Sequence, residues 1–211
     1  MAEGYGDHEG YWNHNVHYHP LVLGAVPEGC GAALDIGCGD GLLARRLAGR
    51  SDAVVGVDVT AEMVRLARER SAGLNNVTFA EADFLYPDRE PLGDGRFDFV
   101  SAVAVIHHVD FGAALAAVER LLAPGGRAMI IGLARNRTPL DWALSAAGIP
   151  AAHRHRRRNG GKGHPDGMPI KDPAMSWGEI RHDAQRLLPG CRFRRHLLWR
   201  YSLTWDKPRS T

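Results

Sequence analysis

The segment Leu34-Asp35-Ile36-Gly37-Cys38-Gly39-Asp40-Gly41 is the most informative part of the sequence, because a short apolar run ends there in glycines and a helical pattern follows at once. The run 32–36 predicts a buried parallel strand, and 42–50 predicts a helix with one apolar face. Glycine tolerates positive φ and lets a ligand approach the backbone closely, while the start of a helix offers free N–H groups. The segment therefore predicts a ligand-binding loop between a strand and a helix.

The same alternation of strand and helix patterns continues along the chain. We expect further strands over 54–57, 77–80, 97–103 and 127–133, a helix over 62–71 capped by Thr60, and a helix over 113–122. Such alternation predicts an α/β fold, an open parallel sheet with helices on both faces. The runs 191–198 and 200–205 leave no room for a helix between them, so they predict an antiparallel hairpin.

Length and composition indicate one globular domain over residues 1–211. The chain has 45% apolar and 24% charged residues, enough for a core and too balanced for general disorder. It has no apolar run of about 18 residues, which a membrane span needs. The polar, acidic first ten residues do not follow the pattern of a signal peptide, so we expect a cytoplasmic protein. Cys30, Cys38 and Cys191 are odd in number and widely spaced, and we expect reduced thiols.

Charge is distributed unevenly along the chain. Residues 1–110 contain 8 Arg and Lys against 17 Asp and Glu, whereas residues 111–211 contain 18 against 7. Residues 1–29, crowded with aromatic and histidine side chains, are interpreted as an N-terminal helical arm or lid. Residues 135–176, rich in Arg, His, Gly and Pro, are interpreted as an insertion or mobile loop on the substrate side. An acidic half and a basic half allow an anionic partner to bind.

A glycine loop alone has more than one interpretation. Residues 39–44 also satisfy the GxGxxA dinucleotide pattern, in which Asp58 would bind the ribose of NAD. Asp35 and Asp40 argue against this alternative, since an anionic pyrophosphate does not favour two carboxylates at its loop. A cationic sulfonium ligand with an ammonium group suits such a loop.

Five segments together resemble the class I S-adenosylmethionine-dependent methyltransferases. They are 35–41, 56–58 with Met63, 81–84, 97–100 and 122–126, in the order and spacing of the family motifs. The resemblance covers about Cys30 to Leu133. It implies a Rossmann-like sheet of seven strands, mostly parallel, with a last antiparallel strand that agrees with the hairpin. It also implies S-adenosylmethionine as the methyl donor and S-adenosylhomocysteine as its product.

The resemblance assigns roles to residues around the loop. The glycines would lie alongside the methionine part of the donor, and Asp58 would bind both ribose hydroxyls. Asp83 would accept a hydrogen bond from the adenine amino group, and Met63 and Phe84 would flank the adenine ring. The simpler alternatives are that Asp83 caps a turn and Met63 is a core residue. The donor site so predicted, with the arm as its lid, comprises Tyr11, Asn15, Tyr18, Asp35, Gly37, Cys38, Gly39, Gly41, Asp58, Val59, Met63, Ala82, Asp83, Phe84, Ala104 and Val105.

Histidines form two groups. His107 and His108 follow the fourth predicted strand, where ligands bind in open α/β sheets, so either could take a proton from a nucleophile. The alternative is that the pair orients a loop. A second group, spread over the arm, lacks the partners of a zinc pattern, and we expect no metal site there. That group comprises His8, His14, His17 and His19.

The basic run 153–164 carries five positive charges and no acid. It is either a solvated loop or a surface for RNA phosphates, an anionic metabolite or a carrier-protein arm. Only Trp142 and Trp177 flank it, so the aromatic platform typical of nucleic-acid binding is missing. We therefore expect a small organic acceptor of the kind found in secondary metabolism, methylated on O, N or C. We also expect a monomer or homodimer. The alternatives are an RNA or peptide methyltransferase, an NAD-dependent oxidoreductase, and a donor-binding protein without activity.

Overall fold

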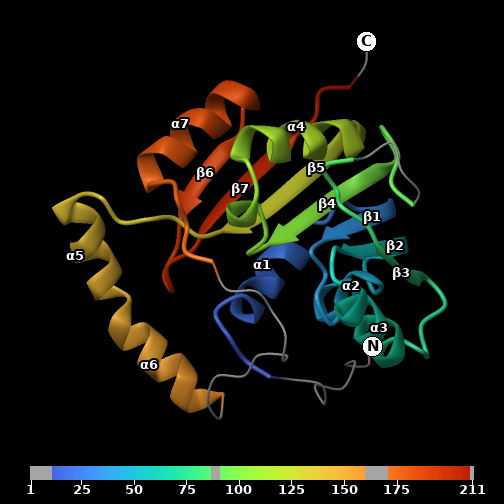
Figure 1. Ribbon diagram of the computed structural model, residues 1–211, viewed down its shortest axis with the longest axis horizontal. Coiled ribbons are helices and arrows are strands. Elements are labelled where there is room, and N and C mark those ends of the chain that lie inside the picture. Colours follow the sequence, from blue (N-terminus) through green and yellow to red (C-terminus); the bar gives the residue numbers. More distant parts are fainter. Residues whose placement is uncertain (1–10, 87–90, 160–170, 210–211) are drawn as a thin grey trace.

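The protein is one seven-stranded sheet with helices on both faces, in a computed structural model that describes residues 11–86, 91–159 and 171–209 (Figure 1). The strands lie in the order β3-β2-β1-β4-β5-β7-β6. β1 to β5 are parallel, and β7 runs antiparallel to both β5 and β6. The bounds are β1 Cys30–Ile36, β2 Ser51–Asp58, β3 Val77–Glu81, β4 Phe97–Val103, β5 Leu122–Gly132, β6 Arg192–Arg195 and β7 Tyr201–Asp206. The predicted fold class and C-terminal hairpin are confirmed.

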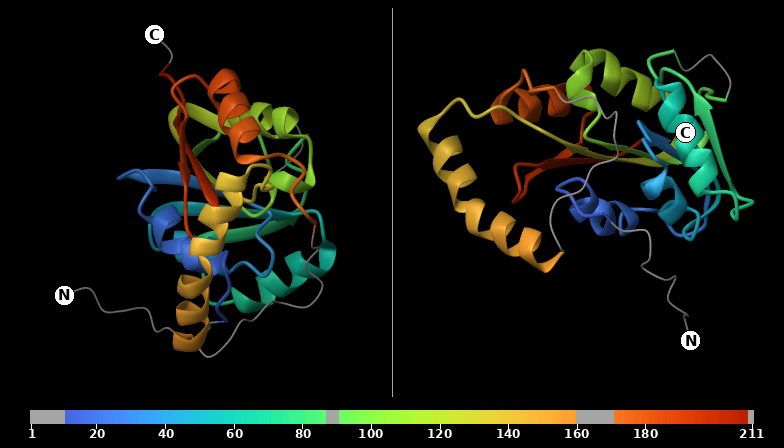
Figure 2. Two further views of the ribbon diagram at one scale, coloured as in Figure 1. Left: turned by 90° about the vertical axis from the view of Figure 1, so that its left-hand side faces the viewer. Right: turned by 60° about the horizontal axis from the view of Figure 1, so that its bottom comes forward.

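Helices cover the two faces in separate groups (Figure 2). One face carries α1 (His19–Leu23), α2 (Leu42–Leu47) and α3 (Ala61–Arg70), and the other carries α4 (Phe111–Leu121) and α7 (Trp177–Leu187). Successive strand residues point to opposite faces, so β1 to β5 contribute to both cores. In β1, for example, Leu34 packs into the core that contains α4 and α7, and Ala33 into the core that contains α1 and α2.

The order of the strands creates a crevice at one point of the sheet. β1 pairs with β2 on one side and with β4 on the other, so the chain leaves β1 and β4 in opposite directions. Such a switch point at the carboxyl ends of parallel strands is where open α/β sheets bind ligands. Ile36 is level with Ala102 there, so the loops that follow β1 and β4 begin side by side.

Segment 135–176 is not the loop that its composition predicted. It contains α5 (Pro139–Ala147) and α6 (Ile149–Arg158), which extend along the edge of the molecule beyond β6. Thr138 and Asp141 form a capping box at the start of α5, and Pro139 occupies its first turn. The cap and the proline favour a helix here, whereas the abundance of Arg, His and Gly suggested a loop. Part of this segment and of the basic run 153–164 lies outside the described residues.

Other element boundaries also differ from prediction. Helix α7 was not predicted, although Ser176 and Glu179 form a capping box at its start. β5 begins at Leu122 instead of Arg127, because 122–126 pairs irregularly with β4 through a register shift. α2 ends at Leu47 instead of at residue 50, and the first strand of the hairpin is shorter than the run 191–198.

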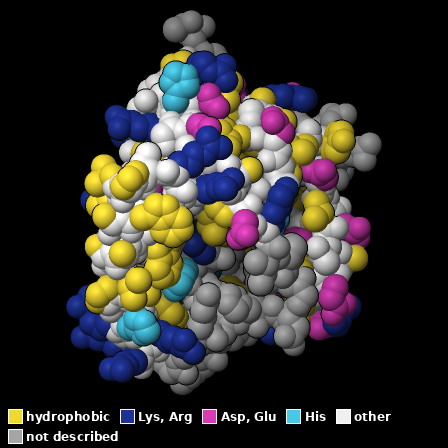
Figure 3. Space-filling model, turned by 60° about the vertical axis from the view of Figure 1, so that its left-hand side comes forward, with side chains coloured by type: hydrophobic (Ala, Val, Ile, Leu, Met, Phe, Trp, Pro, Cys, Tyr) yellow, Lys and Arg dark blue, Asp and Glu magenta, His cyan; other side chains and the backbone are white. Residues whose placement is uncertain are grey.

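One face of the molecule gathers apolar side chains along α5 (Figure 3). Leu140 and Trp142 are about two-thirds exposed, and Leu144 and Ile149 are about half exposed. The last turn of α6 next to this patch carries Arg156, Arg157 and Arg158. Among the described residues, no helix has both the length and the apolar content to cross a membrane.

Candidate functional site

The glycine loop after β1 adopts a backbone that side chains other than glycine resist. Gly37, Gly39 and Gly41 have φ values of 65°, 52° and 78°, in the left-handed region. A Cβ on Gly37 would lie 2.2 Å from Cγ2 of Val105, the second residue after the end of β4. The glycine therefore lets the loops after β1 and β4 approach each other, and it brings two of the predicted donor residues together.

Asp58, at the carboxyl end of β2, ties this loop to the next strand. Its Oδ2 accepts a hydrogen bond from the Gly39 N–H at 3.0 Å, and its Oδ1 accepts one from the Thr60 N–H at 3.0 Å. The side chain of Thr60, predicted to cap α3, makes no capping hydrogen bond. The Asp58 carboxylate is held in a fixed position beside the glycine loop, with its neighbour Val59 exposed.

Asp35 lies beneath the glycine loop. Its side chain is 2% exposed, and Oδ1 accepts a hydrogen bond from the Ser101 hydroxyl at 2.8 Å. The Asp35 pKa is raised to about 7, mainly by burial; the hydrogen bond from Ser101 opposes this rise, and the negative charge of Asp58 adds to it. A ligand cation at the loop would stabilise the ionised carboxylate.

Asp40 connects the loop to the N-terminal arm. Its Oδ1 accepts a hydrogen bond from the Tyr11 hydroxyl at 3.1 Å, and its Oδ2 forms an ion pair with Arg70 of α3. Burial is the main reason that the Tyr11 pKa is raised, and the negative charge of Asp40 adds to it. The arm therefore reaches the glycine loop through Tyr11. Two residues before Asp40, Cys38 is buried and donates its N–H to the Val57 carbonyl at 3.0 Å.

The residues predicted to surround the adenine lie around the end of β3. Ala82 donates its N–H to the Asp58 carbonyl at 3.0 Å, and Asp83 accepts from the Leu85 N–H at 3.0 Å through Oδ1. Asp83 thus caps a turn, as the simpler of the two interpretations predicted. Phe84 and Met63 are buried, with Phe84 in the core beneath α4. Their proposed contacts with a donor stay predictions.

The histidine pair follows β4 on a short 3-10 helix, Ile106–His108. Ala104 precedes it with a φ of 59°, and its N–H bonds to the Ile131 carbonyl at 2.7 Å. The ring centroids of His107 and His108 lie 4.1 Å apart. The buried Nδ1 of His107 has no hydrogen-bond partner among the described residues. The His107 pKa is lowered to about 4, mainly by burial and also by His108 and the positive charges of Arg200 and Lys171. His107 is therefore neutral at physiological pH and can accept a proton.

The arm binds the C-terminal hairpin as well as the glycine loop. Asn15 Oδ1 accepts hydrogen bonds from Arg200 Nε at 3.0 Å and Nη2 at 2.7 Å, and the Tyr18 hydroxyl donates to the Leu197 carbonyl. Both residues were predicted to contact the donor; in the structure their polar groups bind the hairpin.

Trp12 makes a contact that the sequence did not indicate. It is buried, and its ring stacks on His155 of α6 with 6.1 Å between centroids. The basic segment thus packs on the arm at this point. The histidines predicted to lack a metal are engaged separately: His19 Nδ1 contacts Arg46 Nη1 at 3.2 Å, and His14 lies against Trp199. His8 lies outside the described residues.

Two cations at this edge of the sheet were missed. Arg200 immediately precedes β7, and Tyr201 pairs with Gly132 at the end of β5. Lys171 donates to the His108 carbonyl at 3.1 Å. Single cations in a basic half form no sequence pattern. The pairing of β5 with β7 is what brings Arg200 close enough for its charge to lower the His107 pKa.

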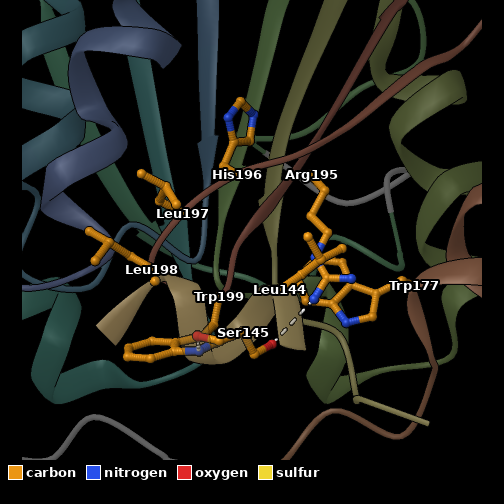
Figure 4. Close-up of a pocket in the computed structure, with 9 residues that line it drawn as sticks. Leu144, Ser145, Trp177, Arg195, His196, Leu197, Leu198 and Trp199 are labelled. Atoms are coloured by element: carbon orange, nitrogen blue, oxygen red, sulfur yellow. Dashed lines mark hydrogen bonds between the residues drawn. The ribbon is translucent and has the colours of Figure 1, made fainter. Parts of the chain in front are cut away.

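A small pocket lies between α5 and the hairpin (Figure 4). Arg195 lies over the Trp177 ring at 3.9 Å and donates to the Ser145 hydroxyl at 3.2 Å, the bond drawn dashed. Leu198 and Trp199 line the other side with φ values of 58°. The volume, about 10 Å³, admits about one water molecule. This pocket is thus too small for an organic acceptor.

The chain is similar to known methyltransferases. A family model described as a methyltransferase domain matches residues 34–130. The uncharacterized methyltransferase Rv0089 of Mycobacterium tuberculosis is 36% identical over 201 residues, which cover 93% of this chain and 98% of that protein. The ubiquinone biosynthesis O-methyltransferase of Sodalis glossinidius is 30% identical over 154 residues, or 70% of this chain and 61% of that protein.

Solved structures give the same fold. The DhpI–SAH complex matches with a TM-score of 0.60 and 25% identity, covering 90% of this chain and 82% of that chain. YcgJ of Bacillus subtilis matches with a TM-score of 0.64 and 22% identity, covering 85% and 71% of the two chains. The likeness extends over the sheet and its flanking helices.

Proposed function

Since this chain belongs to the class I S-adenosylmethionine-dependent methyltransferases, we propose that it transfers the donor's methyl group to O, N or C of a small organic acceptor. The observation that carries the proposal is the hydrogen bond from the Gly39 N–H to the Asp58 carboxylate, beside Gly37, which has a left-handed conformation and packs against Val105. This arrangement supports a donor held by backbone at its methionine end and by a carboxylate at its ribose.

The residues present fit S-adenosylmethionine. The left-handed glycines leave three positions of the loop without side chains, and a Cβ on Gly37 would fill the space toward Val105. Asp35, Asp40 and Asp58 surround the loop with carboxylates, which suit a cationic donor better than an anionic dinucleotide. When bound, the donor supplies a methyl group already activated on a sulfonium. The DhpI–SAH complex, of the same fold, adds support for the product S-adenosylhomocysteine at this site.

The chain's own residues would position the acceptor and accept its proton. His107 is neutral, with its Nδ1 unpartnered among the described residues, and we assign it the role of general base in preference to His108. Tyr11, bonded to Asp40, and the buried Trp12 place the arm over the loop, where it would exclude water. Alignment and water exclusion suffice for transfer from an activated donor.

A small acceptor is favoured over RNA or a peptide. The related Sodalis protein is named an O-methyltransferase of ubiquinone biosynthesis, which supports an organic acceptor and an oxygen nucleophile. In the basic segment, His155 stacks on Trp12 instead of offering its ring to a partner. Family membership argues against an NAD-dependent oxidoreductase. A cytoplasmic monomer or homodimer remains our proposal.

The proposal is tested by measuring release of S-adenosylhomocysteine from S-adenosylmethionine in the presence of acceptor panels. Phenols, catechols, amines and carbon acids form one panel, and total RNA and basic peptides form the other. Turnover with a small molecule and none with RNA or peptides is the expected result. Turnover with RNA alone, at a rate that falls steeply as the salt concentration rises, would contradict a small acceptor and support the RNA methyltransferase alternative. Donor binding without turnover on either panel would favour a donor-binding protein.

A further inference from the structure

Arg200 is a buried cation without an acidic partner among the described residues. It is 8% exposed, and burial lowers its pKa to about 10. Among the described residues, its hydrogen bonds go to uncharged oxygens only: the Asn15 side chain and the carbonyls of Leu198 and Trp199. A buried charge is ordinarily paired, so an unpaired guanidinium is costly unless a ligand completes it.

The position of Arg200 is at the ligand edge of the sheet. Gly132 of β5 pairs with Tyr201, and Ile131 of β5 pairs with Val103 at the end of β4. Ile131 also pairs with Ser202 of β7, so Arg200 is two residues from the β7 position level with the strand end that carries the histidine pair. Its charge lowers the pKa of His107, as does that of Lys171, whose Nζ lies 3.1 Å from the His108 carbonyl.

Cations and acids thus occupy opposite sides of the switch point. Asp35, Asp40 and Asp58 come from the acidic half of the chain and surround the glycine loop. Arg200 and Lys171 come from the basic half and lie by the histidines that follow β4. The uneven distribution of charge along the sequence therefore appears in the site as acids on one side and cations on the other. A cationic donor fits the first side, and an anion fits the second.

We infer that Arg200 and Lys171 bind an oxyanion of the acceptor, namely a carboxylate, and hold the nucleophile of that molecule beside His107. This inference rests on the proposed function, because the acceptor must share the site with the donor. A guanidinium offers a planar fork of N–H groups that matches a carboxylate. The anion would offset the two positive charges near His107 and so make this histidine more basic in the complex than in the free protein.

The experiment is calorimetric titration of the protein saturated with S-adenosylhomocysteine. Benzoate, salicylate and phenylacetate are each compared with their methyl esters, and inorganic phosphate serves as a free oxyanion. At least one acid should bind at least about 10-fold more tightly than its ester, the range of a charge-assisted contact. Phosphate binding as tight as that of every acid would assign the site to free phosphate and overturn the acceptor inference. Equal binding of every acid and its ester would overturn it as well.

Matched variants identify the residues. Lys171→Met should weaken the acid about 3- to 10-fold, and Arg200→Gln should weaken it more than about 10-fold. Arg120→Gln is the control, because Arg120 is exposed on α4 and pairs with Asp94. Each variant is first titrated with S-adenosylhomocysteine alone. If Arg200→Gln does not fold, Lys171→Met and the comparison of acids with esters still test the inference. Unchanged acid binding in Lys171→Met would contradict a site that uses both cations. Failure of the wild-type protein to bind S-adenosylhomocysteine would contradict the proposed function, and with it this inference.

Discussion

The carboxylate of Asp58 accepts a hydrogen bond from the backbone N–H of Gly39 at 3.0 Å, which joins the end of β2 to the loop after β1. Its second oxygen accepts from the N–H of Thr60, at 3.0 Å, just before α3. One side chain thus fixes the positions of two of the segments that the family uses for its donor. Among the described residues, only backbone groups bond to this carboxylate, so its orientation does not depend on the conformations of other side chains.

Asp58→Asn tests the role of this carboxylate. The amide retains one oxygen for Gly39 or Thr60 but loses the charge and one acceptor, so S-adenosylhomocysteine affinity should fall about 10- to 100-fold. Calorimetry gives the affinity, and circular dichroism checks the fold. Unchanged affinity in a folded variant would mean that the ribose lies elsewhere.

Gly37→Ala tests the close approach of the two loops. The left-handed φ of 65° costs alanine about 1–2 kcal/mol, and the new Cβ would collide with Val105. We expect a lower melting temperature and donor-product affinity reduced at least about 10-fold. The double variant Gly37→Ala/Val105→Ala should recover part of both losses, since it removes the collision. Gly178→Ala is the control, because nothing lies within 4 Å of its Cβ position on α7 and its substitution should not destabilise. No recovery in the double variant would show that contact with Val105 is not the constraint.

Asp35→Asn tests the buried carboxyl through the pH dependence of stability. The folded-state pKa of about 7 lies above the ordinary value of 3.8, so the folded protein holds this proton more tightly than the unfolded chain. Stability from this group is therefore complete below about pH 4 and is lost as pH rises toward 7. Relative to wild type, the variant should gain up to about 4 kcal/mol in unfolding free energy between pH 4 and pH 8. Urea unfolding at both pH values measures this gain, and a constant difference would refute the raised pKa.

His107→Ala and His108→Ala separate the two histidines once an acceptor is known. Loss of a general base at His107 should lower kcat about 100-fold, whereas His108→Ala should have a smaller effect. Because the pKa of free His107 is about 4, kcat/KM should stay flat from about pH 5.5 to pH 7.5 instead of falling near the ordinary histidine value of 6.5. Equally small effects on kcat in both variants, with intact donor binding, would mean that the histidine pair has a structural role.

The sequence predicted the sheet because its strands are apolar on both faces and are interrupted by clear helical patterns. β4 was predicted with its observed bounds, and β1 to β3 within a few residues. Helices α5 and α7 were missed for a common reason. Each begins at a capping box, Thr138–Asp141 or Ser176–Glu179, within a segment whose composition resembles a loop. Caps were a usable signal that composition obscured.

The site was predictable only where it is local in sequence. Gly37, Gly39 and Gly41 have the left-handed conformation that such a glycine loop favours. Asn15 was predicted to face the donor, but its binding of Arg200 depends on residues 185 positions apart. The stacking of Trp12 on His155 is equally remote. Such contacts follow from the pairing of β7 with β5 and from the path of α6, which periodicity does not encode.

The most direct test of the account is calorimetric titration of the purified protein with S-adenosylhomocysteine, with NAD as the parallel control. We predict micromolar binding of S-adenosylhomocysteine and no detectable binding of NAD, because Asp35 and Asp40 surround the loop with negative charge. Binding of NAD without binding of S-adenosylhomocysteine would contradict the assignment of the glycine loop to a methyl donor.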